Sequence, residues 1–352
     1  AADGAGDSYK IIKAGSDNRT VLAIRNYCNS GEGFWMRSPN DSFSYASLYA
    51  WPGHKVNYND VYTYAAVQPA SNLKLSSVLF ASAAMATSSV ETYGMITEGQ
   101  PMILRLDGTS KDIGTVTYNT TTGNIKAVKG GISQSVELVV QGNGGTHDWF
   151  YSKTIGTSET INTSTIKSKV GSDIDLSACK IWLEITEDNV SYAVNIEDEI
   201  EKINTTYVTR DELMTAFKPE ADGTATNYGK LVFGKKLDGT TQEWYILGAD
   251  SGVSGDNTII FAASPIATVQ KFDSSSTNKT DSNLWSECNY GGASVTEVFA
   301  NHYGASELRA VLKGMTDGSN TSCFTTAEQG LMNDTTVTTT DKKNRTTYHT
   351  KD

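Results

Sequence analysis

Alternation of apolar and polar residues is clearest between residues 99 and 195. Six short runs there alternate with a period of two and are bounded by Gly, Asn or Asp: 102–108, 113–119, 124–130, 135–142, 148–155 and 179–186. This period is typical of half-buried strands, and the Thr121–Asn124 sequence between two runs indicates a hairpin turn. Six strands in about a hundred residues predict a small all-β sandwich domain. Because catalytic residue types are not grouped in this block, we interpret it as a spacer or packing domain.

The pattern differs on both sides of this block. Towards the start of the chain, residues 20–24 and 73–80 read as strands, and the small residues that follow predict a linker over 86–98. Residues 196–225 predict a helical connector, in which Thr209 and Glu212 have capping-box spacing. Towards the end of the chain, three further strands are predicted over 230–235, 242–248 and 257–264. Two short helices are predicted over 305–312 and 325–332, with Ser306 as the N-cap of the first and either Thr325 or Thr326 as the N-cap of the second.

Between the apolar sequences FWMRSP and AAVQPASNL lies a run of different composition. Residues 40–64 hold five of the 17 tyrosines beside small polar residues. Tyrosine offers a large amphipathic contact area with few rotors to freeze, and small polar residues offer adaptable hydrogen bonds. The alternative is a solvated β-meander that is rich in tyrosine. Under the first interpretation the candidate ligand-binding residues are Asn40, Ser42, Phe43, Ser44, Tyr45, Tyr49, Trp51, His54, Asn57, Tyr58, Asn59, Asp60, Tyr62 and Tyr64.

Composition narrows the class of protein. A length of 352 residues favours two or three domains, and the net charge of −11 argues against a nucleic-acid partner. No apolar run is long enough for a membrane span, and the first residue is Ala1 rather than Met, so a mature or trimmed form is expected. The four cysteines and four histidines are scattered without metal-ligand spacing. We expect no metal, no cofactor and no catalytic residue.

Both ends of the chain resemble parts of one domain. LVFGKKLDGTTQEWYILG, NTIIFAASPIA, LWSECNY, YGASELRAVL and FTTAEQGLMNDTTVTT resemble the first half of a bacterial C-type-lectin-like domain of the branch related to formylglycine-generating enzymes. DNRTVLAIRNY, FWMRSP and AAVQPASNLKLSSVLFASAA resemble its second half, so the two halves stand in permuted order. The resemblance therefore implies a circularly permuted chain, or one cut inside this domain with its second half placed first. The middle block resembles the β-rich domain that follows the lectin-like domain in such proteins.

This resemblance implies an α+β C-type-lectin-like domain assembled from both chain ends, plus a small all-β sandwich domain. The expected boundaries are 1–85 for the second half of the lectin-like domain, 86–98 for the linker, 99–195 for the sandwich, 196–225 for the connector and 226–352 for the first half. The alternative is that each half completes a domain on a neighbouring molecule, which gives self-association by exchange of domain halves.

A narrower resemblance concerns the tyrosine-rich run. Its mixture of Asn, Tyr, Ser, Asp, His and Phe inside a fixed FWMRSP…AVQPASNL frame is similar to that of variable proteins of diversity-generating retroelements. The resemblance implies an extracellular or cell-surface bacterial protein that binds a protein or cell-surface ligand, with a glycan as a further option. A structural pilus-like or cell-surface assembly subunit is the alternative. A formylglycine-generating oxidase is less favoured, because the matching half has only Cys28 where those enzymes use a cysteine pair. Trp35 is expected in the core, whereas Trp51 fits either the core or ligand stacking.

Overall fold

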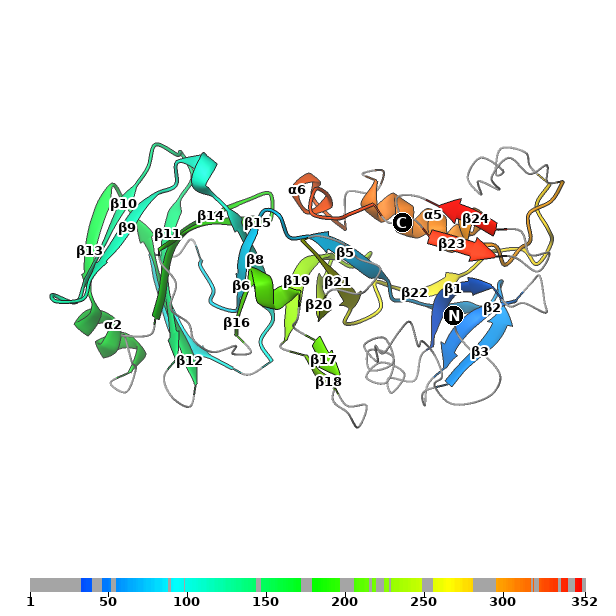
Figure 1. Cartoon of the computed structure of the whole chain (residues 1–352), viewed down its shortest axis with the longest axis horizontal. Coiled ribbons are helices and arrows are strands. Elements are labelled where there is room, and N and C mark those ends of the chain that lie inside the picture. Colours follow the sequence, from blue (N-terminus) through cyan, green and yellow to red (C-terminus); the bar gives the residue numbers. More distant parts are fainter. Residues whose placement is uncertain are drawn as a thin grey trace. The chain divides into compact units, whose positions relative to one another are not determined.

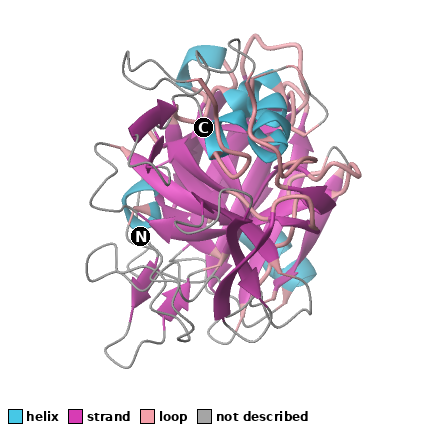
Figure 2. Ribbon diagram, turned by 90° about the vertical axis from the view of Figure 1, so that its right-hand side faces the viewer, coloured by secondary structure: helices cyan, strands magenta, loops and turns pink. Residues whose placement is uncertain are grey.

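The structure is a computed structural model of the chain. It describes residues 33–39, 46–51, 55–87, 90–97, 99–143, 147–171, 179–196, 206–214, 217–219, 225–227, 229–248, 256–280, 296–317, 319, 323–334, 337–340 and 346–349. Strands dominate this part of the chain, and helices are few (Figure 2). None of the helices in these ranges is long and apolar enough to cross a membrane. The predicted strand at 20–24 lies outside the described residues.

The chain divides into two compact units. Unit 1 comprises residues 1–74, 215–227 and 233–352, and unit 2 comprises residues 75–214 and 228–232. Residues from both ends of the sequence therefore belong to one unit. The division falls between Lys74 and Leu75, whereas the expected boundary lies at residue 85.

Unit 2 contains two sheets. Its elements are β6 (Val78–Ser82), β7 (Glu91–Ile96), β8 (Met102–Asp107), η2 (Thr109–Lys111), β9 (Gly114–Asn119), β10 (Asn124–Lys129), β11 (Val136–Asn143), β12 (Asp148–Ile155), β13 (Ser158–Asn162), α2 (Thr163–Val170), β14 (Cys179–Glu187), β15 (Val190–Ile196), β16 (Tyr207–Thr209) and α3 (Arg210–Leu213). The larger sheet has the order β8-β15-β14-β11-β12-β7, with β6 beside β8, and the smaller has the order β13-β10-β9 (Figure 1).

One apolar core joins these two sheets. Buried side chains of the small sheet, such as Ile125, and of the large sheet, such as Leu138 and Leu183, belong to the same cluster. The six strands expected in this block are all present, because each has an apolar face to bury. The hairpin turn at Thr121–Asn124 is confirmed: β9 and β10 pair antiparallel, and Gly123 there has a φ of +68°. The capping box of Thr209 and Glu212 is also confirmed, at the start of α3.

Two expectations about the edges of unit 2 are wrong. The linker expected over 86–98 contains β7, which pairs with β12 over six residue pairs. Small residues before it gave the impression of a linker, but Tyr93 lies opposite Tyr151 in a regular antiparallel ladder. The single strand expected over 73–80 is two strands, because Val78 donates to the carbonyl of Leu75 and turns the chain between β5 and β6.

A buried ion pair lies inside unit 2. The Arg105 side chain is 0 % exposed, and its Nε donates to Glu184 Oε2 at 3.1 Å. Its terminal nitrogens donate to the backbone carbonyls of Ser82, Ile103 and Ala84. Each of the three guanidinium nitrogens therefore donates to at least one acceptor, which offsets the cost of burying the charge.

Glu137, which lies opposite Glu184 on the neighbouring strand, is a second buried carboxylate. Burial raises its pKa, and the nearby Glu184 raises it further, while a hydrogen bond from Thr154 opposes the shift. Its Oε2 is buried and has no hydrogen-bond partner within the described residues. Deprotonated Glu137 is therefore poorly accommodated.

We expect Glu137→Gln to stabilise the protein at neutral pH. A group whose pKa is raised on folding contributes stability that is fully present below the unfolded pKa and is lost as pH rises through the folded pKa. The wild type should therefore lose stability as pH rises from about 4.3, the ordinary value for glutamate, towards neutrality, and the variant should lose less. Urea denaturation across this pH range measures the difference. Parallel curves for the two proteins would contradict the prediction.

Unit 1 is built from the two ends of the chain. Its elements are β1 (Phe34–Pro39), β2 (Ala46–Trp51), β3 (Lys55–Asp60), β4 (Tyr64–Val67), β5 (Ala70–Lys74), β17 (Phe217–Pro219), β18 (Ala225–Asn227), β20 (Thr241–Gly248), β21 (Asn257–Ala262), β22 (Ala267–Lys271), η3 (Tyr303–Ala305), α5 (Glu307–Thr316), α6 (Thr326–Gln329), β23 (Val337–Thr340) and β24 (Thr346–His349). The strand β19 (Lys230–Lys235) has its last three residues in this unit.

Strands from opposite ends of the sequence pair inside unit 1. One sheet has the order β22-β4-β1-β2-β3, so β22 extends a sheet formed otherwise by residues 34–67 (Figure 1). In a second sheet β5 pairs with β21 over five residue pairs. Leu73 also forms a bridge with Met332. The two halves are thus paired with each other within one chain.

The helices of unit 1 begin where their caps predict. Ser306 accepts a hydrogen bond from the amide of Arg309 at the start of α5. Thr325, rather than Thr326, caps α6, and Glu328 completes the capping box. Both N-cap predictions are confirmed for these residues. Trp35 is buried as expected, and Trp244 is buried as well.

Candidate functional site

The described residues of the tyrosine-rich run form β2, β3, the turn after β3 and the first residue of β4. The amide of Thr63 donates to the carbonyl of Asp60 at 2.9 Å, which closes the turn. Inside it, Val61 is 0 % exposed, while the neighbouring Tyr62 is 45 % exposed. The turn therefore places one apolar side chain in the core and the next side chain in solvent.

Three exposed rings lie along this segment. Tyr58, Tyr62 and Tyr64 are 47 %, 45 % and 58 % exposed, and we call them the tyrosine surface. The three residues that follow them, Ala65–Val67, are buried. A fixed backbone carries these rings, which lowers the entropy lost when a ligand binds.

Two of the polar candidates have partners within the turn. Asn59 Oδ1 accepts from the amide of Asp60 at 2.9 Å and lies 3.5 Å from the hydroxyl of Thr63. The phenol of Tyr62 donates to Asp60 Oδ2 at 2.6 Å. Asn59 and Asp60 therefore shape the turn and hold Tyr62.

A lysine from the other half of the chain completes the tyrosine surface. The ammonium of Lys271 lies 4.9 Å from the centre of the Tyr64 ring, because β22 pairs with β4 and sets Lys271 opposite Tyr64. This cation–π contact places a positive charge over one face of the ring. Sequence reasoning missed Lys271, since nothing near it in the sequence connects it with Tyr64.

The segment that carries Lys271 also supports the turn from behind. The amide of Asp273, whose side chain is 1 % exposed, donates to the carbonyl of Val61 at 2.9 Å. Lys279 pairs with the Asp273 carboxylate and donates to the carbonyl of Ala305. Trp35 Nε1 donates to the carbonyl of Gln270 at 2.9 Å. The backbone of the site is thus joined to both halves of unit 1.

The other predicted residues divide into two groups. Tyr49, Trp51 and Asn57 lie in β2 and β3, where Tyr49 is opposite Asn57, and only their backbone is described. The remaining candidates lie outside the described residues: Asn40, Ser42, Phe43, Ser44, Tyr45 and His54.

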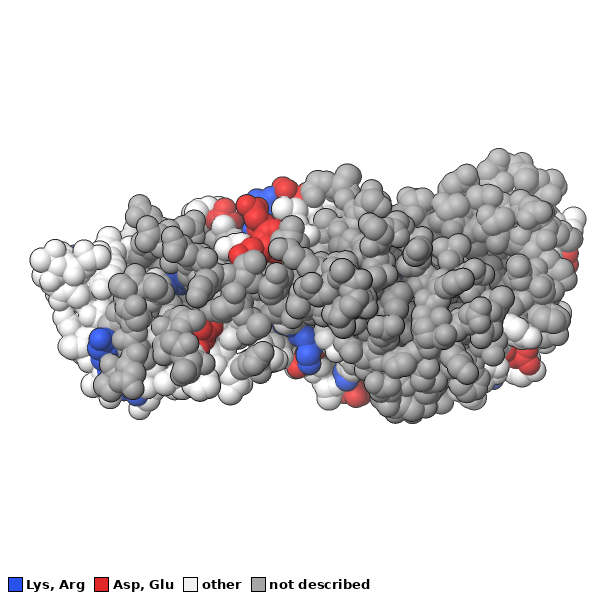
Figure 3. Space-filling model, turned by 60° about the horizontal axis from the view of Figure 1, so that its bottom comes forward, with Lys and Arg blue, Asp and Glu red and all other residues white. Residues whose placement is uncertain are grey.

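Exposed ring faces, rather than a field of like charge, distinguish the described residues of this segment. Lys, Arg, Asp and Glu occur together on the face drawn in Figure 3, without a broad field of positive charge among the residues coloured there. Within the described part of the chain, no group of three His, Cys, Asp or Glu residues is placed to hold a metal ion. Exposed phenols provide apolar faces and hydrogen-bonding tips, the combination that protein-binding surfaces use. Comparisons of the chain with protein-family models, curated proteins and solved structures found no match, so the interpretation of this site rests on its own residues.

Proposed function

We propose that this protein is an extracellular or cell-surface bacterial protein that binds a protein or cell-surface ligand through the tyrosine surface. The observation that supports the proposal is the contrast between three exposed phenols and the buried residues that hold their backbone. The α+β C-type-lectin-like scaffold built from both chain ends, with a β-sandwich unit as a spacer, is part of the same proposal. So is the variability of residues 40–64, which the resemblance to retroelement variable proteins implies. The proposed function is binding alone, without a catalytic step.

We expect the triple substitution of Tyr58, Tyr62 and Tyr64 by Ala to abolish ligand capture without unfolding unit 1. Hot-spot aromatic residues cost more than about 1 kcal/mol each when truncated, so peptides selected from a phage-displayed library on the wild type should lose roughly a hundredfold in affinity or more. Because the rings are exposed, the melting temperature should change by about 2 °C at most.

A matched control exists in unit 2. Val90, Tyr93 and Met95 are 77 %, 48 % and 50 % exposed, and their triple replacement by Ala removes similar side chains elsewhere. The selected peptides should bind this control as they bind the wild type. Equal loss of binding in the two variants would count against the tyrosine surface, as would unchanged binding in the first. A large drop in melting temperature for the first variant would indicate a core role for the rings.

Sequencing sister copies of the gene tests variability separately. We expect substitutions to concentrate at residues 40–64 and to spare both the FWMRSP frame and Lys271. Substitutions spread evenly over unit 1 would contradict the proposed relation to retroelement variable proteins.

One observation favours the second candidate function, that of a structural assembly subunit. The strand β7 pairs with β12 and with no other described strand, and it exposes Tyr93 and Met95. A sheet edge with exposed apolar side chains is a template for pairing with another chain. Light scattering after size-exclusion chromatography distinguishes the two: an assembly subunit should associate as concentration rises, and the Val90, Tyr93, Met95 triple variant should remain monomeric.

A further inference from the structure

Contacts between a lysine and a tyrosine ring recur in this protein. Within the described ranges, three lysines that are not buried have their ammonium nitrogen close to the centre of such a ring: Lys111 at 4.1 Å from Tyr192, Lys169 at 5.8 Å from Tyr93 and Lys271 at 4.9 Å from Tyr64. Each contact holds a cation over an aromatic face. The first two belong to unit 2 and the third to the tyrosine surface of unit 1.

A carboxylate completes both of the contacts in unit 2. Lys111 pairs with Glu187, and Lys169 pairs with Glu91. The second oxygen of Glu91 accepts a hydrogen bond from the phenol of Tyr151, so this carboxylate joins an ammonium and a phenol. The ammonium of Lys169 and, to a smaller extent, the phenol of Tyr151 lower the pKa of Glu91. A charged carboxylate is therefore well accommodated between these two kinds of donor.

The contact in unit 1 has no such carboxylate. Among the described residues, Lys271 forms no ion pair, and the phenol of Tyr64, which is 58 % exposed, has no hydrogen-bond partner. The neighbouring carboxylates Asp60 and Asp273 already have partners of their own. Lys271 and Tyr64 lie opposite each other on paired strands. Two hydrogen-bond donors, one of them charged, therefore stand together without an acceptor from the described part of the chain.

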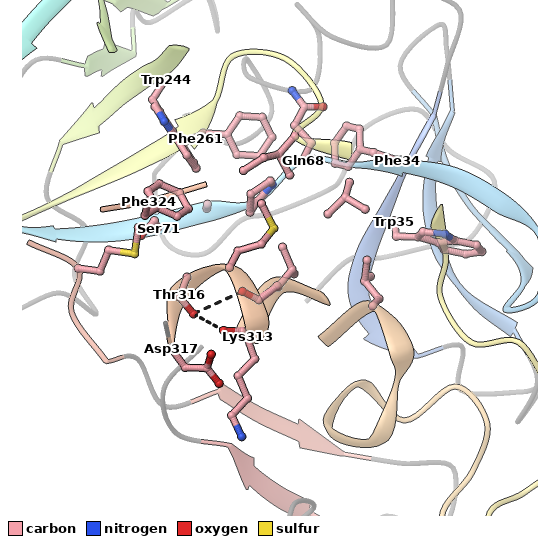
Figure 4. Close-up of a pocket in the computed structure, with 18 of the residues that line it drawn as sticks. Phe34, Trp35, Gln68, Ser71, Trp244, Phe261, Lys313, Thr316, Asp317 and Phe324 are labelled. Carbon is pink, nitrogen blue, oxygen red and sulfur yellow. Dashed lines mark hydrogen bonds between the residues drawn. The ribbon is translucent and has the colours of Figure 1, made fainter. Parts of the chain in front are cut away.

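The buried side chain of Trp35 fixes the backbone that carries Lys271. Its Nε1 donates to the carbonyl of Gln270, and its ring meets the ring of Phe272 edge to face at 5.6 Å. Both sequence neighbours of Lys271 are therefore held by one residue of β1. Figure 4 shows that the rings of Phe34 and Trp35 leave β1 in different directions, as side chains of successive strand residues do. A backbone fixed in this way lowers the entropy lost when a ligand binds.

We propose that the tyrosine surface recognises a protein segment with an acidic side chain, whose carboxylate binds between Lys271 and the phenol of Tyr64. One oxygen accepts from the ammonium and the other from the phenol, the arrangement that Glu91 has in unit 2. The inference rests on the proposed binding function and names the chemistry of its ligand. A phosphate group fits less well, because its charge of about −1.5 to −2 exceeds that of one ammonium.

Two phage-displayed peptide libraries that differ only at a fixed central position, glutamate in one and glutamine in the other, test the proposal. Selection on the full chain should enrich binders from the glutamate library. In isothermal titration, a selected peptide should lose about three- to tenfold in affinity when its glutamate is replaced by glutamine. Lys271→Met should abolish this preference, whereas Lys271→Arg should keep it because the charge remains. Tyr64→Phe, which removes only the hydroxyl, should reduce it.

Lys74→Met is the matched control. Lys74 is an exposed lysine of unit 1 on β5, so its replacement changes the net charge of the protein by the same amount as Lys271→Met. This variant should keep the preference for the glutamate peptide. If it lost the preference as Lys271→Met does, net charge rather than the contact with Lys271 would select the ligand, and the inference would be wrong.

Failure of this inference is distinguishable from failure of the proposed function. Peptides that bind through the tyrosine surface without preferring glutamate to glutamine would overturn the carboxylate and leave the binding function intact. A preference that persisted in Lys271→Met would do the same. If every peptide from both libraries still bound the triple variant of Tyr58, Tyr62 and Tyr64, or if neither library gave a binder, the binding function would be overturned together with the inference.

Discussion

Replacing Arg105 with methionine should lower the free energy of unfolding of unit 2 by about 3–5 kcal/mol. The substitution leaves Glu184, 2 % exposed, without its cation, although Trp182 still donates to it. The carbonyls of Ser82 and Ala84 lose their donors as well. A buried carboxylate without its counter-charge costs far more than the ion pair contributes when intact. Urea denaturation gives the free energy, and hydrogen exchange in β8 and β14 assigns it to unit 2.

Two further variants make this prediction specific. Lys153→Met breaks the ion pair between Lys153 and Glu159, whose side chains are each 27 % exposed. Because water screens an exposed pair, this variant should lose less than about 1 kcal/mol in free energy of unfolding. In Arg105→Met combined with Glu184→Leu the buried charge is gone, so most of the lost stability should return. A loss below about 1 kcal/mol for the single variant would show that solvent reaches Glu184.

The buried pair also indicates which features of the fold a sequence reveals. The alternation around Arg105 predicted β8, because its apolar residues must face a core. The identity of the partner did not follow, since Glu184 approaches Arg105 only after several strands have paired. The helix α2 was missed for a related reason: Ile166 is its single buried residue, so its sequence has no apolar stripe. Likewise β7 follows a run of small residues that resembles a linker.

The features of the candidate site likewise divide into those that the sequence predicted and those that it did not. Composition suggested exposed tyrosines, and Tyr58, Tyr62 and Tyr64 are exposed. The roles of Asn59 and Asp60 depend on a turn whose hydrogen bonds no composition predicts. The contact between Lys271 and Tyr64 depends on the pairing of β22 with β4, which joins distant parts of the chain. Local patterns therefore predict which residues are exposed, and tertiary pairing decides what each one contacts.

Trp35→Ala should destabilise unit 1 by about 3–5 kcal/mol, because it removes a large buried ring. Trp35 is 5 % exposed, and its ring meets the ring of Phe272 edge to face at 5.6 Å. Its Nε1 also donates to the carbonyl of Gln270. Trp35→Phe keeps much of the ring contact, so we expect a smaller loss, and Tyr64→Ala, at an exposed position, should cost about 0.5 kcal/mol or less.

Hydrogen exchange in the Trp35→Ala variant tests whether the two ends of the chain fold as one cooperative unit, which the free energy of unfolding alone does not show. The strand β1 pairs with β4, and β4 pairs with β22, so Trp35 stabilises a sheet to which both ends of the chain contribute. If the two ends fold as one cooperative unit, exchange should rise in β4 and in β22 together. If β22 stayed protected while β1 and β4 exchanged faster, the two segments would be folding separately. The tyrosine surface would then lose the support of Lys271 and Asp273, and the proposed binding function would have to be carried by residues 34–74 alone.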